Sequence, residues 1–253
     1  MRFDIITLFP ELFEAHLIHG VTRRAFEQKL VDVRFWQLRD FGDPPHARVD
    51  DRPYGGGPGM VLLVEPLERA LAAVRADRGD TTPAPLVNFS PAGKPLTQDM
   101  VGGFASSDGA VLLCARYEGV DQRFVDRHVD VELSLGDFVL SGGEIPALAL
   151  LDAVARLQPG VLGDARSHEQ DSFSVGLLDC PHYSRPEHLA GADGDVPEVL
   201  VSGNHAAIER WRRDQSLALT LARRPELIAA ADRAGALDAA DRSSLHARKS
   251  QKL

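Results

Sequence analysis

The sequence predicts an α/β fold in which helices cover a mostly parallel β-sheet over about residues 1–160. Apolar, β-branched segments of strand length alternate with helical segments, as they do in βαβ units. The composition suits a folded chain with a sizeable core, since 44% of the 253 residues are hydrophobic and 26% are charged. The same composition excludes global disorder.

Strands and helices can be assigned in order along this half of the chain. Residues 3–9 are apolar and β-branched, which predicts a strand, and Pro10 begins a helical stretch that continues through Phe26. Residues 31–36 alternate between apolar and polar, as in a half-buried strand. Further strands are predicted at 85–89, 110–115 and 129–135, and further helices at 66–76, 97–104, 121–128 and 144–157.

The character of the chain changes after Pro159. Residues 163–176 are polar and show no periodicity, which indicates a linker. Beyond Pro197 the pattern is helical, with apolar residues spaced for one buried face. We therefore expect a domain at 1–162, a linker at 163–176 and a helical domain at 177–253. The apolar residues of the helical pattern are Ile208, Trp211, Leu217 and Leu221.

Charge is divided unequally along the chain. The formal net charge is −9, which argues against indiscriminate binding to nucleic acid. Residues 205–253, however, contain ten Lys or Arg against six Asp or Glu, an excess of four positive charges. This basic tail is a candidate surface for a polyanion, and a solvated helix face explains it equally well.

Several classes of protein are excluded by simple patterns. No apolar run reaches the roughly 18 residues of a membrane helix, so we expect no membrane partner. The first residues lack the apolar core of a signal peptide. Cys114 and Cys180 are too few for a disulfide framework, which suits a cytoplasmic protein. The spacing of Cys180, His182 and His188 fits no standard zinc site, so we expect no metal ligands there.

Three loops carry the chemistry of the predicted α/β domain. They span residues 88–93, 115–119 and 134–144, and each follows a predicted strand. Ligands of parallel sheets bind beyond the carboxyl ends of the strands, and small residues there let a ligand approach the backbone. None of the loops matches a dinucleotide-binding or Walker A pattern. Together they predict one shared pocket, although each alone would be an ordinary turn.

These loops and four further segments resemble the bacterial tRNA (guanine-37-N1)-methyltransferases, the TrmD family of the SPOUT class. The resemblance runs to about Pro225, and the further segments are 50–60 (DDRPYGGGPGM), 158–163, 171–173 and 176–183. It implies a deep trefoil knot within 1–162 and S-adenosylmethionine as methyl donor. It also implies tRNA with guanine at position 37 as substrate, and a homodimer whose active site is shared between subunits.

The resemblance assigns catalysis to two residues. Asp171 would be the general base that removes the N1 proton of guanine, and Arg156 would stabilise the negative charge that develops on O6. An ordinary Asp has a pKa of about 3.9 and is a weak base unless its surroundings help. Without the resemblance, Asp171 would be a helix cap or a solvated linker residue, and Arg156 a surface residue near a helix end.

The resemblance also implies a cofactor site and a tRNA site. Phe89, Ala115 and Phe138 depart from the family pattern, which we expect to alter cofactor affinity rather than the chemistry. Magnesium is implied for activity, but no ligand cluster is readable beside Glu118 and Asp137. The expected tRNA contacts are Asp50, Arg52, Ser167, His182, Arg210, Arg212 and Arg213. The expected cofactor contacts are Phe89, Ser90, Pro91, Gly93, Ala115, Tyr117, Glu118, Gly119, Ser134, Leu135, Gly136, Asp137, Phe138, Val139, Leu140, Gly142, Gly143 and Pro146.

Two alternatives remain open on the sequence. The chain could be another SPOUT methyltransferase that modifies a different RNA base. The pairing of Asp171 with Arg156, which suits guanine N1, argues against this alternative. It could instead be a non-catalytic RNA-binding protein, which would have no need of an intact cofactor pocket.

Overall fold

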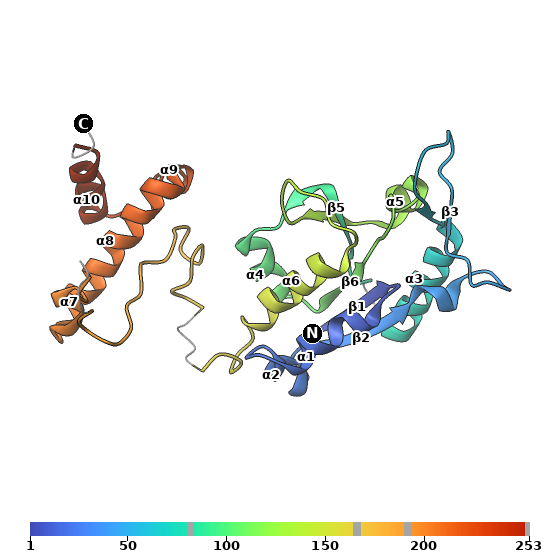
Figure 1. Ribbon diagram of the computed structural model, residues 1–253, viewed down its shortest axis with the longest axis horizontal. Helices are drawn as coiled ribbons and strands as arrows, with labels where there is room; N and C mark the ends of the chain where they lie inside the picture. Colours follow the sequence, from blue (N-terminus) through green and yellow to red (C-terminus); the bar gives the residue numbers. More distant parts are fainter. Residues whose placement is uncertain (80–82, 164–167, 190–193, 251–253) are drawn as a thin grey trace. The chain divides into compact units, whose positions relative to one another are not determined.

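The computed structural model describes residues 1–79, 83–163, 168–189 and 194–250. The chain divides into two compact units, Met1–Ala165 and Arg166–Leu253 (Figure 1). Each unit has its own hydrophobic core, with two clusters in the first and one in the second.

A five-stranded sheet forms the centre of the first unit, and all of its neighbouring strands pair in parallel. The strand order is β2-β1-β6-β5-β7. The predicted α/β fold with a mainly parallel sheet is therefore confirmed. Two short strands, β3 and β4, form a separate antiparallel pair. The bounds are β1 Arg2–Thr7, β2 Asp32–Gln37, β3 Asp50–Asp51, β4 Val61–Leu62, β5 Leu86–Pro95, β6 Gly109–Leu113 and β7 Val131–Ser134.

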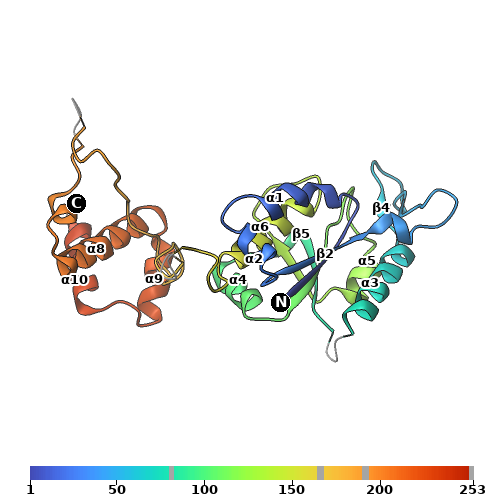
Figure 2. The ribbon, with the colours of Figure 1, turned by 90° about the horizontal axis from the view of Figure 1, so that it is seen from below.

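Helices cover both faces of the sheet, and apolar side chains of the strands are buried on both sides. Helix α6 (Glu144–Ala155) packs on one face with α4 (Gln98–Ala105), and Leu150 and Val101 belong to its core. Helices α3 (Val64–Arg78) and α5 (Gln122–His128) pack on the other. Figure 2 shows α1 and α6 on one side of the strands and α3 and α5 on the opposite side.

The helical stretch predicted from Pro10 through Phe26 is wrong in its continuity. The structure has a 3-10 helix, η1 (Pro10–Phe13), and two short helices, α1 (Glu14–Ile18) and α2 (Arg23–Glu27). His19 is extended and Gly20 has a φ of 76°, so the backbone leaves the helical region between α1 and α2. The glycine tolerates this left-handed conformation because it has no Cβ.

A buried carboxylate, Asp4, lies in the first half of β1. It is fully buried and accepts hydrogen bonds from Arg2 and from the indole of Trp36, at 2.6 and 2.8 Å. Arg78, whose side chain is 4% exposed, donates to it at 2.8 Å. A buried charge needs such partners to offset its lost hydration. None of these residues lines the cavity described below.

The second unit is helical over much of the part that the structure describes. Its core is formed by Leu177, Leu217, Ile228, Ala231, Leu237 and Leu245. Of the predicted apolar face, Leu217 is fully buried and Leu221 packs against this core, whereas Ile208 and Trp211 are half-buried. The helices are α7 Glu198–Val201, α8 His205–Arg223, α9 Pro225–Arg233 and α10 Ala239–Ser250.

Across the described ranges, none of the helices combines the length and the apolar character needed to cross a bilayer.

Candidate active site

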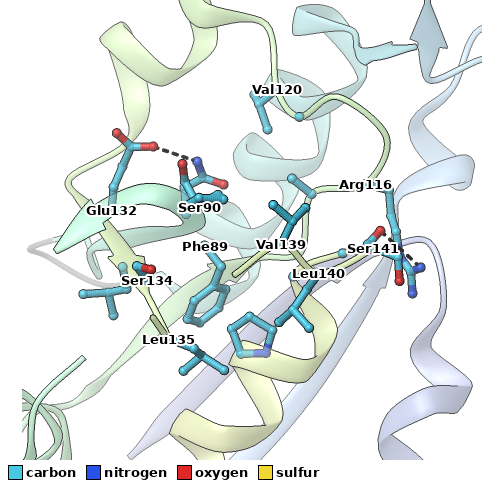
Figure 3. Close-up of a pocket in the computed structure, with 18 of the residues that line it drawn as sticks. Phe89, Ser90, Arg116, Val120, Glu132, Ser134, Leu135, Val139, Leu140 and Ser141 are labelled. Carbon is cyan, nitrogen blue, oxygen red and sulfur yellow. Dashed lines mark hydrogen bonds between the residues drawn. The ribbon is translucent and has the colours of Figure 1, made fainter. Parts of the chain in front are cut away.

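A cavity of about 350 Å³ lies in the first unit, where β5, β6 and β7 end (Figure 3). Its volume is within the range of small-molecule sites. The three strands are parallel neighbours, so the loops that follow them meet at one edge of the sheet. The sequence predicted this meeting of the 88–93, 115–119 and 134–144 loops, and the cavity is lined by residues of all three.

Sixteen of the eighteen residues that the resemblance assigns to the cofactor line this cavity, and Gly93 and Asp137 do not. A Cβ at Gly93 would lie 2.5 Å from the backbone nitrogen of Leu133, so this glycine permits β5 to approach β7 closely. Asp137 is exposed. The sixteen are Phe89, Ser90, Pro91, Ala115, Tyr117, Glu118, Gly119, Ser134, Leu135, Gly136, Phe138, Val139, Leu140, Gly142, Gly143 and Pro146.

Five further residues of the lining lie outside the three predicted loops and were missed by sequence reasoning. Gln122 and Val125 come from α5, which follows the 115–119 loop directly, and their spacing of three places them on one helix face. That helical spacing was a readable signal. Glu132 belongs to β7 itself, before its loop begins. The others are Val120 and Leu133; the lining is completed by Asn88, Arg116 and Ser141, which lie within the predicted loops.

The cavity has an apolar part and a polar part. Figure 3 shows the side chains of Phe89, Leu135 and Leu140 gathered on one side. Glu132 lies on another, where it accepts a hydrogen bond from Nδ2 of Asn88 at 3.0 Å. Asn88 is 5% exposed, and among the described residues its Oδ1 has no hydrogen-bond partner. The site can therefore hold a ligand with both apolar and hydrogen-bonding groups.

The 134–144 loop is fastened to the end of β6 through the backbone. The amide of Gly143 donates to the carbonyl oxygen of Ala115 at 2.9 Å, and Arg116 forms an isolated antiparallel bridge with Gly142. A Cβ at Gly143 would lie 2.6 Å from Cα of Cys114, so only glycine permits this approach. The loop therefore forms a wall of the cavity at backbone contact distance from its neighbour.

Buried polar side chains lie next to the backbone contact between Gly143 and Ala115. Glu144 is 1% exposed; it accepts a hydrogen bond from Thr7 at 2.9 Å, and its Oε2 lies 2.9 Å from Nε of Arg116. Burial, followed by the charge of Glu144, raises the pKa of the neighbouring Cys114 thiol well above its usual range. This cysteine therefore stays protonated and unreactive near neutral pH.

The profile of the family described as tRNA (Guanine-1)-methyltransferase TrmD matches residues 1–230. The chain belongs to the TrmD family. The resemblance inferred from the sequence motifs is confirmed, and so is the prediction that the chain is a methyltransferase.

Individual relatives are similar over nearly the whole chain. A tRNA (guanine-N(1)-)-methyltransferase of Leptothrix cholodnii is 69% identical over 242 residues, which cover 95% of this chain and 96% of the relative. One of Methylibium petroleiphilum is 69% identical over 245 residues, 95% of each chain. One of Burkholderia mallei is 55% identical over 247 residues, 97% of this chain and 93% of the relative.

The two residues that the TrmD resemblance assigns to catalysis lie in different units. Arg156 is half-buried at the carboxyl end of α6, where its amide donates to the carbonyl oxygen of Asp152. Asp171 is half-buried in the second unit, at the start of a turn in which its carbonyl oxygen accepts from the amide of Ser174. Their roles stay predictions.

The predicted tRNA contacts in the 50–60 segment lie at a glycine-rich loop. Asp50 begins β3 and pairs with Leu62, and Arg52 follows on the exposed side of the turn. Tyr54 is 99% exposed at the tip, beside three glycines with positive φ. An unpacked aromatic ring on such a loop suits stacking against a base.

The predicted contacts of the second unit differ among themselves. His182 is exposed and lies 2.8 Å from a carboxylate oxygen of Asp179, and Ser167 lies outside the described residues. Arg212 is exposed, and no ion pair is found for it within the described ranges. Arg210 and Arg213 instead pair with the buried Asp241, at 3.0 and 2.7 Å. These two arginines join α8 to α10, a role the sequence did not indicate.

One group of side chains in the described part of the second unit could approach a metal ion. Ligand atoms of Asp179, Cys180 and His182 lie within 4.8 Å of one another. Asp179 accepts hydrogen bonds from the amide of Cys180 at 2.6 Å, and its carboxylate lies against the ring of His182. These contacts are those of a compact turn and explain why the three side chains meet. The prediction of no metal ligands stays a prediction.

Proposed function

We propose that this chain transfers a methyl group from S-adenosylmethionine to N1 of guanine 37 in tRNA, next to the anticodon. The observation that carries the proposal is the cavity at the ends of β5, β6 and β7, lined by most of the residues that the TrmD resemblance assigns to the cofactor. The names of the relatives support tRNA as the substrate and guanine N1 as the acceptor.

The residues present fit the proposed cofactor. Phe89, Leu135 and Leu140 would hold its apolar surface, and backbone groups of the 134–144 loop would read the purine edge. The carboxylates of Glu118 and Glu132 also line the cavity and would offset the charge of a sulfonium. When bound, the cofactor supplies an electrophilic methyl group. The protein's task is then to position the acceptor nitrogen in line with it.

Guanine N1 must lose a proton for the transfer, and this defines the roles of two side chains. Asp171 would accept the proton, and Arg156 would stabilise the negative charge that develops on O6 of the base. We propose a homodimer in which Arg156 of the first unit and Asp171 from the partner subunit's second unit act on one guanine. The assignment of the two residues to separate units is compatible with such sharing.

The proposal extends to the architecture of the chain. We propose that residues 1–162 contain a deep trefoil knot that forms the cofactor site. Close backbone contact between the 115–119 and 134–144 loops and the non-sequential strand order support it. Residues 163–176 would be the linker, and the helical domain at 177–253 would grip the tRNA. We further propose that Mg²⁺ supports activity and that the enzyme works in the cytoplasm.

The test combines cofactor binding with methylation. Isothermal titration of the protein with S-adenosylmethionine should show binding, and the protein should methylate a tRNA bearing G36–G37 faster than one in which G36 is replaced. Asp171→Ala should lower the single-turnover rate by about 10²-fold or more, with the tRNA affinity kept within about twofold. Asp232→Ala, which removes an exposed carboxylate of α9, is the matched control and should leave the rate unchanged.

Each failure points to a different alternative. Methylation of another base would indicate a SPOUT enzyme with a different target. Absence of S-adenosylmethionine binding would favour a non-catalytic RNA-binding protein. Near-normal methylation by Asp171→Ala would show that this residue is not the base.

A further inference from the structure

A buried carboxylate next to the cavity has a position that packing alone does not explain. Glu144 is the first residue of α6 and is 1% exposed, yet it is not part of the cavity lining. An isolated buried charge is strongly unfavourable, so its partners decide whether it can stay there. Those partners are Thr7 at the end of β1, which is fully buried and donates at 2.9 Å, and Arg116.

Arg116 does line the cavity, and it contacts three different segments. Its Nε lies 2.9 Å from Oε2 of Glu144, its Nη1 donates to the carbonyl oxygen of Ser141 at 3.4 Å, and its guanidinium lies 4.6 Å from the ring centre of Phe9. Figure 3 shows Arg116 beside Ser141 at the edge of the cavity. The side chain thus contacts the 134–144 loop, the start of α6 and the segment that follows β1.

The contact between Arg116 and Glu144 is an ion pair rather than an aligned hydrogen bond. Nε and Oε2 meet the distance of an ion pair, yet neither atom makes a hydrogen bond within the part of the chain that the structure describes. The two groups are mostly buried, so electrostatic attraction between them is strong and stabilises the pair. Contacts with Phe9 and Thr7 restrict their geometry. Such a pair depends on the charge of Glu144 and on the planar guanidinium of Arg116, whose contacts with Phe9 and Ser141 a lysine ammonium does not reproduce.

The glycines of the 134–144 loop leave space for the ion pair of Arg116 and Glu144. A Cβ at Gly142 would overlap Nε of Arg116 and Oε2 of Glu144, so the absence of a side chain there leaves room for the two charged groups to meet. On the backbone side, Gly142 bridges Arg116 and Gly143 donates to Ala115. The ion pair and the backbone contacts therefore fix the same stretch of loop from two sides.

We propose that Arg116, Glu144 and Thr7 form a clamp that positions the 134–144 loop as a wall of the cofactor cavity. In this proposal Glu144 and Thr7 are positioning residues that act through Arg116 and do not touch the cofactor. The identity of the occupant, S-adenosylmethionine, rests on the proposed function. The clamp itself is a property of the protein before any ligand binds, so it can be tested separately.

The first test measures hydrogen exchange in the 134–144 loop, in the absence of a ligand. Hydrogen exchange at the amides of residues 140–144 should become about tenfold faster in Glu144→Gln and in Arg116→Lys than in the unaltered protein. Arg78→Lys is the matched control, because it alters another buried arginine–carboxylate pair, Arg78 with Asp4 at 2.8 Å, away from the cavity. It should leave exchange at 140–144 unchanged. Unchanged exchange in Glu144→Gln would overturn the clamp.

The second test measures the affinity of the protein for the cofactor. Titration with S-adenosylmethionine should give a Kd about tenfold higher for Glu144→Gln and for Arg116→Lys, while the kcat of Glu144→Gln at saturating cofactor stays within about twofold. The double variant should lose no more affinity for S-adenosylmethionine than either single variant, because the two substitutions break the same interaction. Thr7→Val, which keeps the shape of the side chain, should raise Kd by a smaller factor and serves if Glu144→Gln does not fold.

The outcomes separate the clamp from the proposed function. If the unaltered protein fails to bind S-adenosylmethionine but exchange still rises in Glu144→Gln, the clamp stands and the proposed function falls. If the unaltered protein binds and Glu144→Gln binds equally well, the clamp is wrong. If Arg116→Lys lowers the affinity for S-adenosylmethionine and Glu144→Gln does not, the clamp is also wrong. Arg116 would then act by contacting the cofactor directly.

Discussion

At the scale of single residues, glycine has a steric role in the cavity wall. Gly143 is buried, and the space where its Cβ would stand is occupied by backbone atoms of Cys114 and Ala115. A flexible side chain could turn aside from an added methyl group, whereas the buried backbone that follows β6 has little freedom to do so.

Replacement of Gly143 should therefore harm both stability and cofactor binding. We expect Gly143→Ala to lower the free energy of unfolding by about 2–3 kcal/mol, as overpacking does, and to raise the Kd for S-adenosylmethionine by more than about tenfold. Urea denaturation and isothermal titration measure the two effects. Gly102→Ala is the control: it lies in α4 with open space around it, so the added methyl should be neutral or mildly stabilising. A neutral Gly143→Ala would mean that the loop moves away easily.

At the scale of elements, the pairing of α8 with α10 depends on one carboxylate. Asp241 is 2% exposed at its side chain and meets Arg210 and Arg213, while Arg210 also pairs with Asp214. Burial opposes the ionisation of Asp241, but the hydrogen bonds from Arg213 and Arg210 outweigh it and hold its pKa below the usual value. The charge of this residue is thus part of the fold.

This lowered pKa predicts how the second unit responds to acid. Because Asp241 holds its proton less tightly when folded than when unfolded, its contribution is present above the unfolded pKa of about 3.9 and is lost as the pH falls through the lower folded pKa. Unfolding followed by Trp211 fluorescence should show stability falling in this acidic range. The fall should be weaker in Asp241→Asn, which is already destabilised by about 3 kcal/mol at neutral pH.

The exposed pair of Asp232 with Arg242, at 3.0 Å, provides the comparison within the same unit. Asp232→Asn should change stability by less than about 1 kcal/mol, since exposed ion pairs contribute little. An equal loss in the two variants would contradict the structural role given to Asp241.

Sequence reasoning succeeded where local patterns decide the structure. The strands that became β1, β2, β5, β6 and β7 follow from β-branched, apolar segments, and the loops after three of them were recognised as a pocket. It failed where the decisive partner is distant in sequence. Arg116 reads as an ordinary loop residue until the fold brings Glu144 to it, and Arg213 reads as a phosphate contact until Asp241 pairs with it.

The break between α1 and α2 has a more local cause. Gly20 was a readable signal, because a glycine in a helical pattern can leave it at little steric cost. The apolar spacing on either side of the glycine hid this signal. The roles of Asp171 and Arg156 could not be reached from pattern at all and came from the family resemblance.

At the scale of the whole molecule, charge is distributed so that attraction to RNA is local. The net charge is −9, while residues 205–253 carry four excess positive charges. Four of the arginines in this tail are paired with carboxylates, which leaves fewer cations for phosphates; they are Arg210, Arg213, Arg224 and Arg242. Recognition of tRNA must then depend on a few contacts and on shape.

This distribution predicts a modest dependence of tRNA binding on salt. With about two to four phosphate contacts, the slope of log K against log salt should be about −2 to −4. Filter binding or fluorescence titration across a salt series measures it. Arg212→Ala should reduce the slope by about one, whereas Arg242→Ala, which removes the exposed partner of Asp232, should not. A slope steeper than about −7 would show that many more phosphates are neutralised.

The order of the strands has a consequence for synthesis of the chain. β1 forms next to β2 early, but its other neighbour is β6, so that Arg2 pairs with both Asp32 and Gly109. At about 5–20 residues per second, the ribosome takes several seconds more to deliver the second partner. During that interval one edge of β1 is open to other chains, which is a template for aggregation. Docking of β2 covers one edge of β1, and the other edge of β1 stays open until β6 arrives.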